Sequence, residues 1–254
     1  MKVNLLGLGL ILLTALLLLV WTRLPAARRR LSFRQLPAFQ QLRQAIGLAV
    51  EGGKRLHVSL GSAGLLTTEN ASGLVGLSVL RRIAEISIIS DRPPLATSGD
   101  GAMALLSQNA LHAAYETVKA EELYDPDRGR LTGVTPAAFI AGTIPVMRSE
   151  QISANLLVGN FGPEAVLLCD TAGQEESFLL AATDSLPAQA ALYAAAQEPL
   201  IGEELFAIPA YLQAGPVFSA SLRVQDILRW LLITALLGAA IVKLLLETGG
   251  MVLP

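Results

Sequence analysis

Two long apolar runs bracket this chain and constrain its fold more than any other feature. The first extends from Leu5 to Trp21, and the second from Trp230 to Leu246, where Lys243 is the only charged residue. Each holds about 17 residues, which as an α-helix reach roughly 26 Å, close to the hydrocarbon thickness of a bilayer. The stretch between them, from Thr22 to Arg229, has the composition of a water-soluble domain. We therefore predict one folded domain flanked by an N-terminal and a C-terminal transmembrane helix.

A cleaved signal peptide is the alternative for the first run, because Lys2 precedes it and small residues follow it at positions 26 and 27. The run is longer than the apolar core of about 7–15 residues that is usual in signal peptides. It is also followed by a cluster of arginines, a pattern typical of the cytoplasmic side of a membrane anchor: Arg23, Arg28, Arg29 and Arg30. We interpret the run as an uncleaved anchor.

Basic residues also predict the orientation. They follow the first run and precede the second, where Arg223 and Arg229 stand. The positive-inside rule then places the large domain in the cytoplasm, with the N-terminus and the C-terminal tail outside the cell (inner or plasma) membrane. Cys169 is the only cysteine, so an intramolecular disulfide is excluded, in keeping with a reducing compartment.

The expected division of the chain follows from composition. Residues 1–55 carry nine Lys/Arg and one acidic residue, whereas the remainder carries ten Lys/Arg and twenty Asp/Glu. The basic part is expected to fix the topology, and attraction to anionic lipid at the membrane surface is the alternative role. The acidic domain predicts no nucleic-acid partner. The predicted segments are an anchor (1–21), a basic membrane-proximal linker and helix (22–55), an α/β domain (56–222) and an anchor with a short tail (223–254).

Hydrophobic patterning predicts a cytoplasmic α/β domain with a mixed sheet. Three short strands are each expected to precede a helix: 56–60, 95–97 and 131–134. Helices are expected at 70–90, at 101–120 and from Thr135-Pro136, the last including a buried apolar stretch at 139–147. Three further strands with short turns between them indicate a meander: 155–159, 165–169 and 178–182. Two helices are expected after it, from Ser185 and at 202–212.

One string matches a nucleotide-binding motif. Asp170-Thr171-Ala172-Gly173-Gln174-Glu175 is identical to the switch-II string of Ras-like GTPases. Such enzymes also need a loop that ends in Gly-Lys-Ser/Thr, and the nearest segment, Gly47 to Lys54, has one residue too many and is followed by Arg55. We interpret the string as a tight turn between two strands and predict no GTP binding and no cofactor.

Metal and catalytic constellations are not recognisable. His57, His112 and Cys169 are too few for a common zinc site, and no G-x-S-x-G string is present. His57 falls in a predicted strand and is expected to be a packed core residue. The sequence therefore shows no catalytic motif and leaves enzymatic activity undecided.

Three loops, each between a predicted strand and a predicted helix, form the candidate site. In an open α/β sheet such loops gather at the carboxyl ends of the strands, where helix N-termini offer N–H groups to an anion. Ordinary helix caps and turn glycines are the alternative explanation. The candidate ligand-binding residues in these loops are Gly61, Ser62, Gly64, Ser98, Asp100 and Thr135.

Four strings, spread over residues 53–230, resemble a family known only as a domain of unknown function in bacterial and archaeal membrane proteins. They are Gly53–Gly61, Thr97–Gly101, Ile201–Ala207 and Ser221–Trp230. The resemblance implies no activity. It adds Glu203 and Glu204 to the candidate ligand-binding residues.

Three functions remain open at this stage. The first is a membrane protein whose cytoplasmic domain binds a small ligand or a protein partner, as a sensor or assembly subunit. The second is a membrane-tethered enzyme acting on a small anionic substrate, and the third is an oligomeric membrane scaffold. An enzyme is expected to bring titratable groups together in one place, so the position of His57, Asp100, Glu203 and Glu204 in space discriminates among them.

Overall fold

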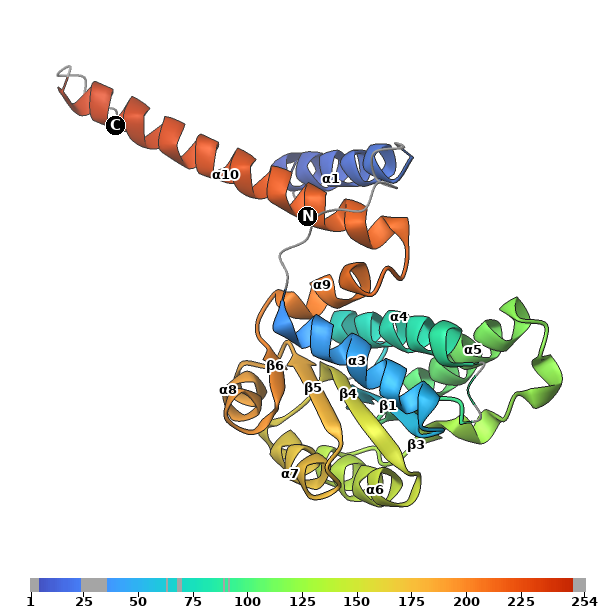
Figure 1. Cartoon of the computed structure of the whole chain (residues 1–254). Coiled ribbons are helices and arrows are strands. Elements are labelled where there is room, and N and C mark those ends of the chain that lie inside the picture. Colours follow the sequence, from blue (N-terminus) through green and yellow to red (C-terminus); the bar gives the residue numbers. More distant parts are fainter. Residues whose placement is uncertain are drawn as a thin grey trace. The chain divides into compact units, whose positions relative to one another are not determined.

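A computed structural model describes residues 5–23, 36–62, 64–67, 70–88, 90 and 92–248 (Figure 1). The chain divides into two compact units. One consists of Met1–Ser32 and Gly215–Pro254, and the other of Phe33–Ala214. The first unit holds the helices α1 (Leu5–Arg23) and α10 (Pro216–Thr248), and the second holds every strand that the structure describes.

The first unit contains the candidate membrane segments. By length and composition, the part of α10 from Pro216 to Leu244 is able to cross a membrane, with a mean hydropathy of 2.0. α1 lies beside α10, and the Arg223 guanidinium stacks 5.1 Å from the centre of the Trp21 ring. The apolar stretch of α1, Gly7–Arg23, is shorter and sits at the lower length limit for a span. Among the described residues, one helix is therefore long and apolar enough to cross a membrane, whereas the sequence predicted two.

The second unit is built on one six-stranded sheet with the strand order β3-β2-β1-β4-β5-β6. The strands are β1 (Arg55–Gly61), β2 (Leu95–Ser98), β3 (Gly129–Leu131), β4 (Ile152–Asn160), β5 (Phe178–Thr183) and β6 (Glu198–Leu200). Every neighbouring pair is parallel, and in the central pair His57 lies opposite Asn155. The α/β class is confirmed, but the predicted mixed sheet is wrong. Parallel neighbours require crossover connections, which here contain the helices.

Helices cover both faces of the sheet. One face carries α3 (Pro37–Glu51), α4 (Asn70–Ser87), α5 (Gly101–Thr117) and α9 (Glu204–Tyr211), and the other carries α6 (Pro136–Ser149), α7 (Val166–Gln174) and α8 (Leu186–Ala195). Each face has its own apolar core, with Leu42, Val58 and Leu80 in one and Phe139, Leu168 and Leu179 in the other. Three short 3₁₀ helices complete the unit: η1 (Glu121–Leu123), η2 (Pro126–Arg128) and η3 (Pro163–Ala165).

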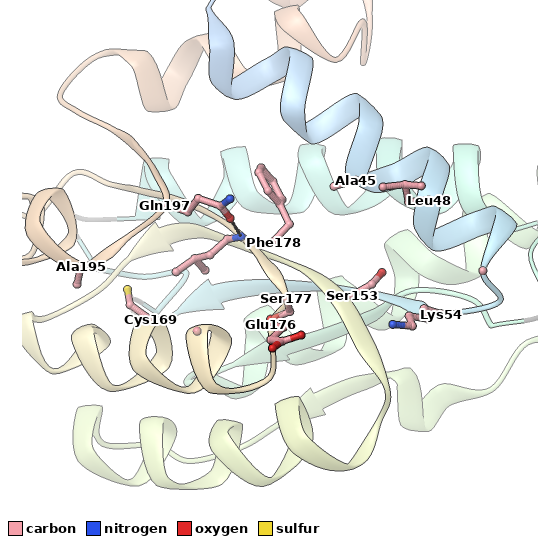
Figure 2. A pocket seen from close by; sticks show the side chains of 13 residues that line it. Ala45, Leu48, Lys54, Ser153, Cys169, Glu176, Ser177, Phe178, Ala195 and Gln197 are labelled. Atoms are coloured by element: carbon pink, nitrogen blue, oxygen red, sulfur yellow. Dashed lines mark hydrogen bonds between the residues drawn. The ribbon is translucent and has the colours of Figure 1, made fainter.

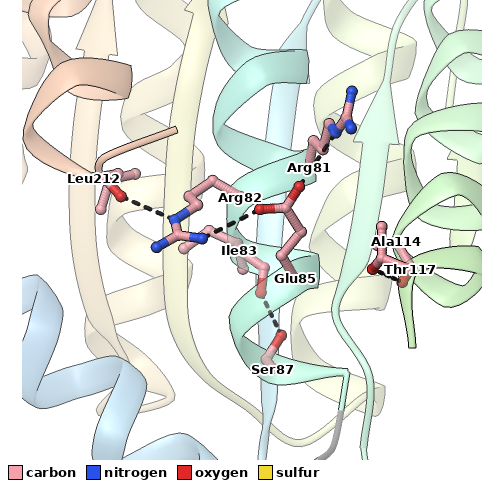
Figure 3. Close-up of polar contacts among 8 residues, drawn as sticks. All are labelled: Arg81, Arg82, Ile83, Glu85, Ser87, Ala114, Thr117 and Leu212. Atoms are coloured by element: carbon pink, nitrogen blue, oxygen red, sulfur yellow. Dashed lines mark hydrogen bonds and ion pairs between the residues drawn. The ribbon is translucent and has the colours of Figure 1, made fainter. Parts of the chain in front are cut away.

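A polar contact joins two helices of the first face (Figure 3). Arg82 of α4 donates from Nε to the carbonyl of Leu212, the residue that ends α9, at 3.0 Å. The same guanidinium pairs with Glu85 at 3.2 Å. α9, which follows the last strand, is therefore fixed against α4, which follows the first.

The predicted meander is the largest error in the secondary structure. Residues 165–169 were expected to form a strand and Asp170–Gly173 a turn, yet both belong to η3 and α7. Pro163 begins this helical segment, and the buried positions Leu168, Cys169, Thr171 and Ala172 recur with the period of a helix. The apolar run has no alternation that would have distinguished the two conformations.

The order of the strands creates a switch point between β1 and β4. The chain leaves β1 towards α4 on one face of the sheet and leaves β4 towards α7 on the other. In doubly wound α/β folds, ligands bind outside the carboxyl ends of the strands at such a point. The fold therefore favours a ligand site at the loops after β1 and β4.

Candidate functional site

The loop after β1 lies against its neighbours through backbone hydrogen bonds. The N–H of Gly99 donates to the carbonyl of Gly61 at 2.8 Å, and the N–H of Ser62 donates to the carbonyl of Asn160 at 2.9 Å. Gly61 has a φ of +78°, and a Cβ there would lie 2.0 Å from the Asn160 carbonyl oxygen. Only glycine fits at this position, where the chain leaves β1 against the end of β4.

The three loops predicted from the sequence do meet. A Cβ at Gly99 would lie 2.8 Å from Cα of Ser62 and 3.3 Å from the carbonyl oxygen of Gly133. A Cβ at Gly64 would lie 3.1 Å from Oδ2 of Asp100. The loops after β1, β2 and β3 therefore form one continuous surface. They are part of what we call the carboxyl edge, which comprises the carboxyl ends of all six strands and the loops that follow them.

Helix caps account for part of this surface. Asp100 accepts the N–H of Met103 at 3.0 Å through Oδ1 and so caps α5, and Thr135 caps α6 by accepting the N–H of Ala138 at 3.3 Å. Ser98 is buried, and its hydroxyl donates to the carbonyl of Asp100 at 3.3 Å. These three side chains support the loops, which is the role that the alternative explanation gave them.

Sequence reasoning missed the contribution of the strands β4 and β5. Asn160, at the end of β4, donates from Nδ2 to Asp184 at 2.8 Å, and the N–H of Phe161 donates to Thr183 Oγ1 at 3.2 Å. These residues lie on the other side of the switch point from Ser62. An Asn after a long apolar strand is the signal that could have identified them, but the mistaken meander hid their position.

Glu203 and Glu204 do not join this group. They follow β6, which lies four strands from β2 in the sheet order. At roughly 4.8 Å per strand, β6 and Asp100 are about 19 Å apart across the sheet. The two glutamates therefore mark the far end of the carboxyl edge.

The carboxyl edge is acidic. The loop residues that the structure describes between each strand and the next helix include Asp100, Asp184 and Glu203, and none of them is Lys or Arg. Helix N-termini contribute only partial positive charge. Electrostatics here favour an uncharged or cationic group over the anion expected from the sequence.

His57 is buried in the middle of the sheet, on the α6–α7 face. With the amide oxygen of Asn155 as acceptor, Nδ1 donates to it at 2.8 Å, and Nε2 accepts from the Thr97 hydroxyl at 2.9 Å. Asn155 in turn donates to Ser177 at 2.8 Å, and Ser59 lies 3.2 Å from Thr97. Burial lowers the pKa of His57 to about 4, with Asn155 opposing and Arg130 adding to the shift. His57 is a neutral structural residue, far from Asp100 along its strand direction.

A cleft of about 630 Å³ opens elsewhere, at the amino ends of β4 and β5 (Figure 2). It is lined by the last turns of α3 and α7 and by mostly apolar side chains, with Lys54, Ser153, Glu176 and Gln197 as polar members. Helix C-termini, which carry partial negative charge, border it. The Cys169 thiol also faces this cleft, and burial raises its pKa to about 11. At neutral pH the Cys169 thiol in this cleft is therefore protonated.

Metal and nucleotide chemistry find no support in the geometry. No cluster of three or more His, Cys, Asp or Glu suited to a metal occurs in the part of the chain that the structure describes. The string Asp170–Glu175 lies on α7 and its C-terminal cap, and not in the turn between two strands that the sequence predicted.

Comparison with known proteins identifies the family of the chain. Neither the curated proteins nor the solved structures include a similar chain. The family model described as a domain of unknown function, DUF6754, matches residues 2–251. This confirms the resemblance to a domain of unknown function over almost the whole chain, and the chain belongs to the DUF6754 family.

Proposed function

We propose that this chain is a membrane-anchored binding protein, whose α/β unit recognises a small hydroxyl-bearing molecule at the carboxyl edge. The observation that carries the proposal is the convergence of the loops after β1, β2 and β3 at the switch point beside β4. Ser62 lies at their centre, half-buried, between Gly99 and Asn160. Loops held by a rigid parallel sheet are the usual place for a ligand in such folds.

The chemistry of the edge favours an uncharged polyol. The carboxylates of Asp100 and Asp184 and the amide of Asn160 hydrogen-bond hydroxyl groups well, and no Lys or Arg among the described loop residues is placed to neutralise an anion. This proposal replaces the small anionic substrate expected from the sequence. The enzyme alternative also required His57, Asp100, Glu203 and Glu204 to converge, and their positions in the sheet separate them.

The membrane part of the proposal rests on α10 and on charge. α10 is long and apolar enough, from Pro216 to Leu244, to span a bilayer. We propose α1 as a second span and a cytoplasmic α/β unit, because arginines flank both apolar runs on the side of that unit. The lipid bilayer is then the first partner, and ligand binding is passed to a protein partner or a second copy of the chain, as in a sensor or assembly subunit.

A thermal-shift experiment with matched compounds tests the ligand class. The full chain in detergent is heated with adenosine or glucose and, separately, with AMP or glucose 6-phosphate. The proposal predicts that an uncharged compound raises the melting temperature. Ser62→Ala and Asp100→Asn should each weaken the affinity by roughly tenfold, since each removes a hydrogen-bonding group while Asn keeps the helix cap.

Ser78→Ala serves as the control, because Ser78 lies on α4, its side chain donates to the carbonyl of Leu74 in the same helix, and it is remote from the loops. It should leave the shift unchanged. The proposal fails if no uncharged compound stabilises the protein, or if Ser62→Ala and Asp100→Asn respond as Ser78→Ala does.

A further inference from the structure

Four arginines gather at the opposite, amino edge of the sheet. Arg55 begins β1, Arg92 precedes β2, Arg128 ends η2 just before β3, and Arg130 lies in β3. Because β1, β2 and β3 are parallel neighbours, their amino ends lie side by side. Glu150, just before β4, binds two of the arginines, Arg55 through Oε2 and Arg130 through Oε1 at 2.7 Å.

Within the described part of the chain, the positive charge of this cluster exceeds the negative charge in contact with it. Glu150 is shared by two guanidinium groups, and Asp125 lies 3.7 Å from Nε of Arg128, beyond hydrogen-bond distance. Burial lowers the pKa of Arg55; Glu150 opposes the shift, and Arg128, Arg92 and Arg130 add to it. Among the residues that the structure describes, these four cations therefore have two carboxylates as ion-pair partners, and the side chains of Arg55 and Arg128 are only 15% and 17% exposed.

Several buried polar atoms of the cluster have no hydrogen-bond partner among the described residues. They are Nε of Arg55, Nε and Nη1 of Arg128, and the hydroxyl of Tyr115. Contacts bring these groups together: the Tyr115 ring packs on that of Tyr124, the residue before Asp125, which pairs with Arg128, and Glu150 joins Arg55 to Arg130. Burial raises the pKa of Tyr115. Unpaired buried donors are costly and rare in folded proteins. All of these atoms can donate, so what would complete them is an acceptor with several oxygens.

We propose that Arg55, Arg128 and Tyr115 form a binding site for a phosphate group, with Arg130 and Glu150 positioning Arg55. Guanidinium groups present paired N–H donors that match the oxygens of a phosphate, and a dianion would balance the excess charge. Tyr115 contributes a neutral donor from α5, and its ring is fixed edge-on to Tyr124 at 5.8 Å. The site is independent of the carboxyl edge, because it lies at the other ends of the strands.

Titration of inorganic phosphate into the full chain in detergent tests the site, with sodium chloride at equal ionic strength as the reference. We expect a saturable rise in melting temperature. Arg128→Gln should raise the dissociation constant at least about tenfold and Tyr115→Phe severalfold, since hydrogen bonds to charged groups are the strong ones. Without phosphate, both variants should be as stable as the native chain or more so, because each removes an unpaired buried group.

Arg81→Gln is the matched control, since Arg81 is a surface arginine of α4 with a side chain 59% exposed (Figure 3). It should bind phosphate as the native chain does. A second arm with a short-chain phosphatidic acid assigns the site to a lipid headgroup if it binds tighter than phosphate, and to a soluble phosphate if it does not. A phosphate effect no larger than that of chloride, or equal losses in Arg128→Gln and Arg81→Gln, would overturn the proposal. Ser62→Ala should not alter phosphate binding. The test of the phosphate site is therefore independent of the test of ligand binding at the carboxyl edge.

Discussion

His57 shows how a single residue sets a pH dependence. Its imidazole is fully buried and hydrogen-bonded through both nitrogens, and its pKa in the fold is about 4 against 6.5 for the free side chain. In the unfolded chain the His57 imidazole therefore binds a proton below about pH 6.5, whereas in the folded chain it does so only below about pH 4. Stability that is fully present above pH 6.5 is lost as the pH falls through this window, by an amount on the order of 3 kcal/mol.

Replacing this imidazole should remove that window. His57→Gln is expected to lower the free energy of unfolding at pH 7 by about 1–3 kcal/mol, because it disrupts the hydrogen bonds to Asn155 and Thr97. Its unfolding free energy should then change less than that of the native chain between pH 6.5 and 4. His112→Gln, at a half-exposed histidine beside Glu116, is the control. Equal slopes for the native chain and His57→Gln would contradict the assignment.

At the scale of elements, the packing of α4 on the sheet depends on one glycine. A Cβ at Gly76 would lie 2.3 Å from the carbonyl oxygen of Val158 and 2.8 Å from a methyl of Leu60. The carbonyl belongs to the central strand β4 and cannot move aside without disturbing the ladder. The glycine thus permits the helix after β1 to lie close to β4.

A pair of glycine substitutions tests this close approach. Gly76→Ala should destabilise the protein by about 1–3 kcal/mol through overpacking. Gly47→Ala, on α3 with no atom within 4 Å of the added methyl, should instead stabilise by about 0.5–1 kcal/mol through helix propensity. The stabilities of the two variants and the native chain are compared by thermal unfolding followed by circular dichroism. A neutral or stabilising Gly76→Ala would mean that α4 does not approach β4 as described.

The elements also show where reasoning from sequence succeeds and where it fails. The strands β1, β2, β4 and β5 and the helices capped by Asp100 and Thr135 carry local signals, and their predictions are confirmed. β6 was missed because it is three residues long and contains Pro199. α7 was mistaken for a strand because a short apolar run fits either period, and this error replaced a parallel sheet by a mixed one.

The candidate site was predictable only in part for the same reason. The alternation of strands and helices predicts the loops around Ser62 and Asp100, and these loops do come together. The contribution of Asn160 depends on β4 lying beside β1, which is a long-range pairing that no local pattern encodes. Likewise, Arg55 and Arg128 are far apart in sequence, and only the sheet order brings them to one edge.

At the scale of the whole molecule, the orientation across a membrane is the first matter to test. Cys169 is a poor reporter, because its thiol is buried and its pKa is about 11. In a Cys169→Ala background, Glu122→Cys places a thiol on the exposed η1. We expect a membrane-impermeant maleimide to label it only after the cells are permeabilised, whereas Met251→Cys in the tail should be labelled in intact cells. The reverse pattern would place the α/β unit outside.

Amide hydrogen exchange of the full chain in detergent is the most direct test of ligand binding at the carboxyl edge. Exchange is measured with and without the uncharged compound that most raises the melting temperature. We expect slower exchange in peptides 61–67 and 98–103, which cover the loops after β1 and β2. We expect no change in peptides 45–54 and 176–179, which lie beside the cleft at the amino ends of β4 and β5. Protection confined to the cleft peptides would contradict it.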